Sequence, residues 1–199
     1  WDASGNVMAR GDEALARAVA ALTRGEVVAV KGIGGFHLMV DARSGEAVAK
    51  LRTRKLRREK PLAVMAAGLP EARELCALSA EEEAALASPE APILLARRGD
   101  RCAVDPAVAP ANPYLGVMLA STPLHHLLLR GCGFPLVATS GNLAEEPICT
   151  SEDEAVRRLA GVADGFLVHD RPIARHVDDS IVWFLDGDVR VLRRARGFA

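Results

Sequence analysis

Short apolar runs alternate along this chain with segments whose apolar residues have helical spacing. The first helix is predicted to begin at Asp12, which can cap it, and to end at Gly25. Apolar runs predict strands at residues 27–30, 36–42, 61–67, 92–98, 114–119, 135–140, 180–185 and 188–194. This alternation predicts an α/β domain built around a twisted mixed sheet with flanking helices.

Helix-end signals and turn residues divide the rest of the chain. One helix is predicted from about Ser44 to Pro61, and two more lie before residue 92, the second opening with a Ser79–Glu82 capping box. Another helix is predicted over residues 121–131, and the last runs from a Ser151–Glu154 capping box to near Gly161. The strand at 36–42 is expected to alternate between buried and exposed positions. Residues 99–113 form a predicted loop, and Asp186–Gly187 predicts a hairpin turn between the last two strands.

Composition makes the chain an ordinary globular protein. Its 199 residues are half hydrophobic and carry a formal net charge of −1, which argues against a general nucleic-acid or membrane-surface binder. We expect one domain over residues 1–199, with 1–11 as a lead-in segment. No run is long enough to cross a membrane, no signal-peptide pattern is present, and we expect a cytoplasmic location. The start at Trp1 without Met suggests a fragment excised from a longer protein.

The four cysteines are widely spaced and form no CxxC pair, so the sequence encodes neither a zinc site nor a disulfide framework. No Ser-His-Asp or Cys-His arrangement is specified by spacing either. Free thiols are expected, and no covalent nucleophile is indicated.

A basic stretch interrupts this neutral composition near the end of the second helix. Lys50, Arg54, Arg57 and Arg58 would share one helix face, where like charges repel unless an anion binds. A small anionic ligand fits such local density better than a long polyanion. A solvated face beside acidic partners is the alternative.

Two loops that follow strands carry groups suited to phosphate or ribose. The glycines of KGIGGFH (residues 31–37) would let backbone amides approach a phosphate, although a plain tight turn explains them equally well. In TSGN (residues 139–142), hydroxyl and amide side chains at a strand end can bind ribose or phosphate oxygens, or form an ordinary turn.

Residues 169–180 gather charged groups immediately before an apolar strand. Because unpaired polar groups are costly near a core, this cluster is either a salt-bridged crossing or one wall of a site. Asp178 and Asp179 are expected to pair with Arg171, Arg175 or a magnesium-bound nucleotide. His169 and His176 lack regular metal-ligand spacing, and His125 and His126 are expected to be structural, one packed and one exposed.

Six collinear segments together resemble the YrdC-like domain of the HypF carbamoyltransferases, which act in [NiFe]-hydrogenase maturation. They are residues 31–42, 51–65, 112–129, 136–148, 169–182 and 193–199, and the likeness runs from about residue 20 to the end. The resemblance implies a YrdC/RibB-like twisted mixed sheet with a deep positively charged cavity. There ATP and a donor derived from carbamoyl phosphate would give carbamoyl-adenylate and pyrophosphate, with Mg²⁺ bridging the phosphates.

The resemblance also suggests which residues carry these roles. Nucleotide binding is expected of Lys55, Arg57, Lys60, Thr139, Ser140, Asn142, Ser180, Arg193 and Arg194. Catalytic roles are expected of Lys31, His37, Arg175 and Asp178, and substrate binding of Gly34, Gly35, His169 and Arg171, with no metal held directly by the protein.

The family's other domains and its partner HypE are the implied partners, so this chain alone should not complete carbamoyl transfer. Two other enzymatic or binding functions remain open, namely threonylcarbamoyl-adenylate synthesis for tRNA modification and RNA binding through the basic helix. A nucleotide-binding scaffold that is inactive without its neighbours is the third alternative.

Overall fold

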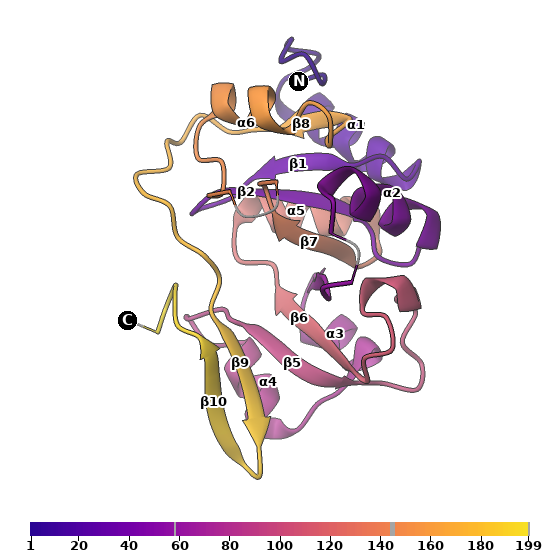
Figure 1. Cartoon of the computed structure of the whole chain (residues 1–199), viewed down its shortest axis with the longest axis vertical. Helices are drawn as coiled ribbons and strands as arrows, with labels where there is room; N and C mark the ends of the chain where they lie inside the picture. The colour runs from indigo at the N-terminus through magenta and orange to yellow at the C-terminus, as the bar shows by residue number, and fades with distance from the viewer. Residues whose placement is uncertain (58, 144–145, 199) are drawn as a thin grey trace.

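The computed structural model describes residues 1–57, 59–143 and 146–198. Within these residues ten strands form one sheet in the order β10-β9-β5-β6-β3-β7-β2-β1-β8, with β4 paired to β5 (Figure 1). The strands are β1 (Val28–Lys31), β2 (Phe36–Asp41), β3 (Ala63–Ala66), β4 (Cys76–Ala77), β5 (Ile93–Arg98), β6 (Tyr114–Leu119), β7 (Leu136–Ser140), β8 (Gly165–Leu167), β9 (Ile181–Leu185) and β10 (Asp188–Arg193). The pairs β1–β8, β3–β6 and β5–β9 are parallel and the others antiparallel, which confirms the predicted mixed sheet.

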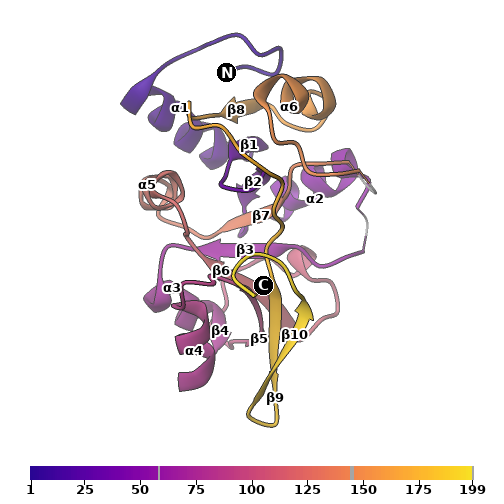
Figure 2. The same cartoon turned by 90° about the vertical axis from the view of Figure 1, so that its left-hand side faces the viewer.

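Helices cover both faces of this sheet (Figure 2). They are α1 (Gly11–Thr23), α2 (Gly45–Lys55), α3 (Leu69–Leu75), α4 (Ala80–Leu86), the 3₁₀ helix η1 (Pro106–Val108), α5 (Pro123–Cys132) and α6 (Glu152–Leu159). α1 packs against α5 and β8, and its buried residues Ala18 and Leu22 join one apolar cluster with strand residues Val28 and Met39. Neighbouring positions Val27 and Ala29 belong to the opposite cluster, where α2 and α6 lie. Successive strand residues therefore enter two different cores.

Burial on both faces explains why β2 does not alternate as predicted. Only His37 in β2 is less than fully buried. A strand with helices on both sides has no solvated face and becomes apolar throughout. The short strands β4 and β8 were not predicted, because two or three residues show no period.

Several helix ends differ from the predicted ones. α2 stops at Lys55 rather than Pro61, because Leu56 adopts a left-handed conformation with φ 56°. α5 passes through Gly131 and ends at Cys132, before Gly133, whose φ is 69°. A Cβ at Gly131 would lie 2.7 Å from Val19 of α1. Gly131 thus permits close helix packing instead of ending the helix.

The predicted caps are partly confirmed. Ser79 and Glu82 form a reciprocal capping box at the start of α4. Ser151 accepts from the Glu154 amide, but the Glu154 carboxylate takes the amide of Thr150, so this box is half formed. Asp12 lies inside the first turn of α1 and does not cap it.

The hairpin turn at Asp186–Gly187 is confirmed, with both residues at positive φ and Leu185 paired to Asp188. All four cysteines are free. No helix among the described residues combines the length and apolar character needed to cross a bilayer.

Residues 168–180 make a long connection without helix or strand, from β8 at one sheet edge to β9 near the other. Figure 1 shows this segment running down the side of the sheet. It is fastened to the β1–β2 turn, because the Val177 amide donates to the Gly34 carbonyl at 3.1 Å. A Cβ on Gly34 would lie 2.3 Å from the Val177 carbonyl oxygen. Glycine at position 34 therefore lets the crossing segment lie directly on the turn.

Gly34→Ala should lower the free energy of unfolding by about 1–3 kcal/mol, because the crossing segment must move away to admit the methyl group. Urea unfolding followed by circular dichroism measures the change. Gly161→Ala is the matched control, since nothing lies within 4 Å of its Cβ position, and it should change stability by less than about 0.5 kcal/mol. Equal effects of the two substitutions would contradict the proposed contact.

Candidate functional site

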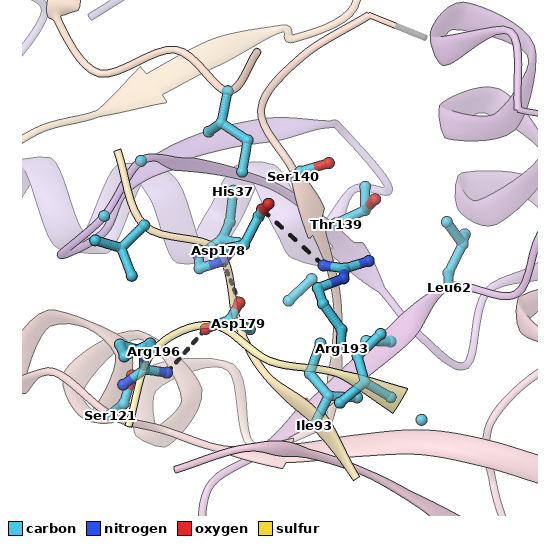
Figure 3. Close-up of a pocket in the computed structure, with 18 of the residues that line it drawn as sticks. His37, Leu62, Ile93, Ser121, Thr139, Ser140, Asp178, Asp179, Arg193 and Arg196 are labelled. Carbon is cyan, nitrogen blue, oxygen red and sulfur yellow. Dashed lines mark hydrogen bonds and ion pairs between the residues drawn. The ribbon is translucent and has the colours of Figure 1, made fainter. Parts of the chain in front are cut away.

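A cavity of about 310 Å³ lies between the β1–β2 turn, the end of β7 and the crossing segment (Figure 3). Its lining draws on distant parts of the chain, from Ile33 to Arg196. One side is apolar, with Leu62, Ile93 and Leu95 among its residues. A flat apolar group with a charged end would fit this combination of surfaces.

Cationic and hydroxyl groups gather on one wall of the cavity. Arg57 lies 3.5 Å from the Thr139 hydroxyl through one terminal nitrogen and donates to the Pro61 carbonyl through the other, at 2.8 Å. Its Nε is buried without a hydrogen-bond partner among the described residues. Burial, together with the charges of Arg52 and Arg193, lowers the pKa of Arg57. Clustered cations of this kind favour an anion in the space between them.

Lys55 fixes the loop behind this wall. Its buried ammonium donates to the Ser140 carbonyl at 2.5 Å and to the carbonyl and side-chain oxygens of Asn142 at 2.6 and 2.8 Å. Burial, with a smaller contribution from the charge of Arg57, lowers the pKa of Lys55 to about 8. The Ser140 hydroxyl donates to the Asn142 side chain at 2.7 Å. The TSGN loop is therefore a fixed platform whose Thr139 and Ser140 face the cavity.

A hydrogen-bonded group of three residues occupies another part of the lining. Asp179 accepts from Arg196 at 2.8 Å through Oδ1 and lies 3.3 Å from His37 Nε2 through Oδ2. Burial alone would raise the pKa of Asp179, but the hydrogen bond from His37 and the charge of Arg196 hold it well below its ordinary value. Asp179 is thus an ionised acceptor, and His37 Nε2 carries the proton that it donates.

Behind His37 lies a second imidazole, His125, at a ring-centroid distance of 5.6 Å. Burial, and then the charge of His37, lowers the pKa of His125 to about 3, so it stays neutral. Its packing confirms that one histidine of the pair is buried and the other exposed. Its place in the cavity lining was not predicted.

Asp178 stands at the cavity beside more exposed groups. Its Oδ1 lies 4.0 Å from Arg193 and 3.8 Å from His176, and its side chain is 39% exposed. Weak pairs at this exposure contribute little to stability. Asp178 and Asp179 both line the cavity, so the crossing segment forms part of its wall. The expected pairing with Arg171 or Arg175 is wrong, because Asp179 pairs with Arg196 and His37, and Asp178 lies nearest to Arg193 and His176. A role of this wall in a functional site stays a prediction.

Eight of the predicted site residues line the cavity: Gly34, Gly35, His37, Arg57, Thr139, Ser140, Asp178 and Arg193. The glycines do so while forming a tight turn, in which the Gly32 amide donates to the Gly35 carbonyl. The described lining holds three arginines and two aspartates. The positive charge of the cavity as a whole stays a prediction.

The structure does not bring the other nine to this lining: Lys31, Lys55, Lys60, Asn142, Arg171, Arg175, His169, Ser180 and Arg194. Lys31 is buried and donates to Glu152 at 2.5 Å and to the His169 carbonyl at 3.0 Å. Ser180 is buried and ties the C-terminal segment to β9 through Ala195 and Arg196.

Four of the nine, Lys60, Arg171, Arg175 and Arg194, are exposed. Asn142 lies behind the cavity with Lys55. Binding roles for these nine residues stay predictions.

The predicted basic helix face does not form as expected. Lys50 donates to the Gly25 carbonyl and Arg54 to Val162 and Asp164, so both hold the fold together. Arg57 lies beyond the end of α2, and Arg58 lies outside the described residues. The interpretation of a face beside acidic partners is correct for Arg54, and support for an RNA-binding helix is weakened.

Four lining residues were not among the predicted site residues, namely Asp179, Arg196, Ser121 and His125, although Asp179 was considered as a partner of Arg171, Arg175 or a magnesium-bound nucleotide. A signal existed for Asp179, which is adjacent to Asp178, and for Arg196, which belongs to the terminal basic cluster. Nothing in the spacing shows that Arg196 returns to Asp179. Within the described ranges no group of three or more His, Cys, Asp or Glu side chains could hold a metal ion.

Arg196→Gln should lower the free energy of unfolding near pH 6 by about 2 kcal/mol, because Asp179 keeps its charge and loses its cationic partner. The pKa of Asp179 in the folded protein lies below its ordinary value of 3.8. Its stabilising contribution is therefore complete above about pH 4 and is lost as the pH falls through the folded-state pKa.

The difference between wild type and variant should accordingly shrink at pH 2.5, measured by urea unfolding at both pH values. Arg190→Gln, which breaks an exposed pair with Asp188, is the control and should have little effect at either pH. A pH-independent loss for Arg196→Gln would rule out the linkage.

The chain resembles known proteins over nearly all its length. Residues 20–195 match the Sua5_yciO_yrdC family model, described as "Telomere recombination". The chain is 51% identical over 199 residues to the carbamoyltransferase HypF of Synechocystis, covering all of this chain and 26% of that protein. It is 32% identical over 161 residues to a threonylcarbamoyl-AMP synthase of Xanthomonas campestris, covering 74% of this chain and 83% of that protein.

A crystal structure of full-length HypF in a phosphate- and nucleotide-bound form superposes with a TM-score of 0.90 at 45% identity. The alignment covers 93% of this chain and 29% of that one. The chain thus spans about a quarter of the length of the HypF relatives that it matches. It belongs to the Sua5/YciO/YrdC family, as a YrdC-like domain of the kind found in HypF carbamoyltransferases.

Proposed function

We propose that this domain binds ATP in the cavity and joins its AMP part to carbamate, giving carbamoyl-adenylate and pyrophosphate. The observation that carries the proposal is the wall formed by Arg57, Arg193, Thr139 and Ser140 beside an apolar surface in one cavity. Arginine side chains provide forked donors for phosphate oxygens, and the Thr139 hydroxyl adds a neutral donor, whereas the Ser140 hydroxyl donates its proton to Asn142. The nucleotide-bound state of the related HypF structure supports the choice of ligand.

In the proposed reaction a carbamate oxygen attacks the α-phosphorus of ATP. A new P–O bond forms, the bond between the α-phosphorus and the bridging oxygen breaks, and pyrophosphate leaves with the electron pair. No covalent enzyme intermediate is needed, so positioning and charge stabilisation supply the catalysis. Arg57 and Arg193 would hold the phosphates, and His37 would act through Asp179 at the carbamate end.

Mg²⁺ would supply positive charge that neutralises the phosphates, and it would be held mostly by phosphate and water oxygens. Asp178 offers a partly exposed carboxylate oxygen near Arg193, which suits such a hydrated ion. The other domains of a HypF-type protein and HypE would then take the carbamoyl group onward, toward the cyanide ligands of a [NiFe]-hydrogenase. The free thiols fit a cytoplasmic protein.

Threonylcarbamoyl-adenylate synthesis is the second candidate, and the similarity to threonylcarbamoyl-AMP synthases favours it. The higher identity to HypF proteins, 51% against 32%, supports the carbamoyl reaction instead. The two activities differ in whether the amine of threonine must be accommodated.

Arg57→Met should weaken ATP binding by about 10- to 100-fold, because a charged donor to phosphate is lost. Isothermal titration calorimetry with ATP and Mg²⁺ measures the affinity. Arg97→Met, an exposed substitution on β5 away from the cavity, is the control and should bind as wild type does. An unchanged affinity in Arg57→Met would place the nucleotide elsewhere.

Pyrophosphate release from ATP should depend on added carbamate and should not respond to threonine. The reason is that the AMP part of ATP must be transferred to a carbamate oxygen, and the cavity is proposed to hold carbamate without a substituent on its nitrogen. A coupled pyrophosphate assay decides the matter, with carbamate in one reaction and threonine plus bicarbonate in the other, because the threonine amine must first take up CO₂ to present a carbamate oxygen. Threonine-dependent turnover would refute the carbamoyl assignment and favour the tRNA-modifying activity.

A further inference from the structure

Asp179 is the least expected charge in a cavity proposed to hold a triphosphate. A carboxylate repels phosphate, yet this one lies in the lining with only 17% of its side chain exposed. Its pKa is held low, so protonation does not remove the repulsion near neutral pH. Its position therefore calls for a part of the ligand that carries hydrogen-bond donors and no negative charge.

The surroundings of Asp179 fix its orientation and leave it unsaturated. Arg196 donates to one carboxylate oxygen and His37 to the other. Arg196 also donates to the Ala91 carbonyl at 3.1 Å, which anchors its guanidinium. A carboxylate has about four acceptor positions, so two donors leave capacity for others. Figure 3 shows Asp179 between Arg196 and the ring of His37, with Asp178 beside it.

The His37 ring packs against the ring of His125. Its Nδ1 and both nitrogens of His125 are buried and have no hydrogen-bond partner among the described residues. The two ring centroids are 5.6 Å apart and the ring planes are tilted by 50°. The hydrogen bond between Nε2 and Asp179 and the packing against His125 together fix the orientation of the His37 ring.

The cavity lining thus holds two chemically distinct groups of side chains. Among the described residues Arg57 forms no ion pair and lies beside the Thr139 hydroxyl, and the nearest carboxylate to Arg193, that of Asp178, is 4.0 Å away, so both arginines suit phosphate oxygens. Arg196 already compensates the charge of Asp179, so the lining around Asp179 suits a neutral hydrogen-bond donor. In a carbamoyl-adenylate the phosphate and the terminal NH₂ group lie at opposite sides of one carbonyl carbon.

We infer that Asp179, held by His37 and Arg196, accepts a hydrogen bond from the carbamoyl NH₂ group and so selects an unsubstituted carbamoyl group. This specificity role rests on the proposed adenylate-forming function. Leaving an ionised acceptor unpaired is costly, so a ligand without the NH₂ donors should bind more weakly. His37 is here a positioning residue, which acts on the ligand through Asp179.

Two stable analogues of the adenylate test this inference without turnover. In both, a sulfamoyl group replaces the phosphate of the adenylate. One carries a carbamoyl group ending in NH₂, and the other carries an acetyl group with a methyl in the same place. The pair has the same shape and differs in its hydrogen-bond donors.

Calorimetry should show that the wild-type domain binds the carbamoyl analogue at least about tenfold more tightly than the acetyl analogue. Asp179→Asn should reduce the ratio to less than about threefold, because one amide group cannot accept from His37, Arg196 and the ligand together. Asp186→Asn is the matched control on the exposed hairpin turn, where Asn tolerates the positive φ, and it should keep the wild-type ratio.

Equal affinities of the wild type for the two analogues would overturn the inference and leave the proposed function intact. Binding of neither analogue would overturn both. If Asp178→Asn lost the preference and Asp179→Asn kept it, the carbamoyl group would be recognised by Asp178, and the inference about Asp179 would be refuted.

If Asp179→Asn does not fold, the wild-type domain still decides through NMR of its ¹³C-labelled aspartates. The Asp179 carboxylate resonance should shift with the carbamoyl analogue far more than with the acetyl analogue. Equal shifts with both would refute the contact.

Discussion

The whole site depends on one topological constraint, which is that the chain must pass from β8 at one edge of the sheet to β9 near the other. A connection without helix or strand has to find hydrogen bonds for its backbone wherever it lies. It finds one at the β1–β2 turn, where Val177 meets Gly34, and another where the Arg196 amide donates to the Asp178 carbonyl. Because these attachments hold the segment above the sheet, the space beneath it becomes a cavity.

The same attachments explain why charged side chains are tolerated near the core. Lys31 is almost fully buried, and it joins Glu152 of α6 to the start of the crossing segment at His169. Asp179 and Arg196 perform the same task at the other end. Breaking a buried pair costs far more than forming it contributes, so such pairs fix geometry more than they add stability. Between the two anchors the exposed residues Arg171 and Arg175 have no such structural role among the described contacts.

Sequence reasoning predicted the parts of the fold that local pattern determines. The mixed sheet, the Ser79 cap and the Asp186–Gly187 hairpin are of this kind, since each depends on residues close in sequence. It failed where tertiary contacts override the pattern. Leu56 ends α2 early although nothing in the local sequence requires it, because the Arg52 side chain gathers the carbonyls of Arg57 and Lys60 beneath the helix end. Tertiary contacts also remove the predicted basic face, because Lys50 and Arg54 donate to groups elsewhere in the fold.

In the candidate site, too, the residues that were predicted are those that a local pattern marks. Thr139, Ser140 and Arg57 were predicted because short motifs and a family resemblance mark them, and the cavity brings them together. The sequence marks Asp179 only as one of two adjacent carboxylates near several arginines, and it marks His125 as structural, because a histidine in an apolar helix looks structural in one dimension. Their significance comes from long-range contacts, since the His37–Asp179 and Asp179–Arg196 pairs join β2, the crossing segment and the C-terminal segment. The proposed selection of one small acid over another needs such contacts, because only groups held from several directions keep an acceptor in place without a ligand.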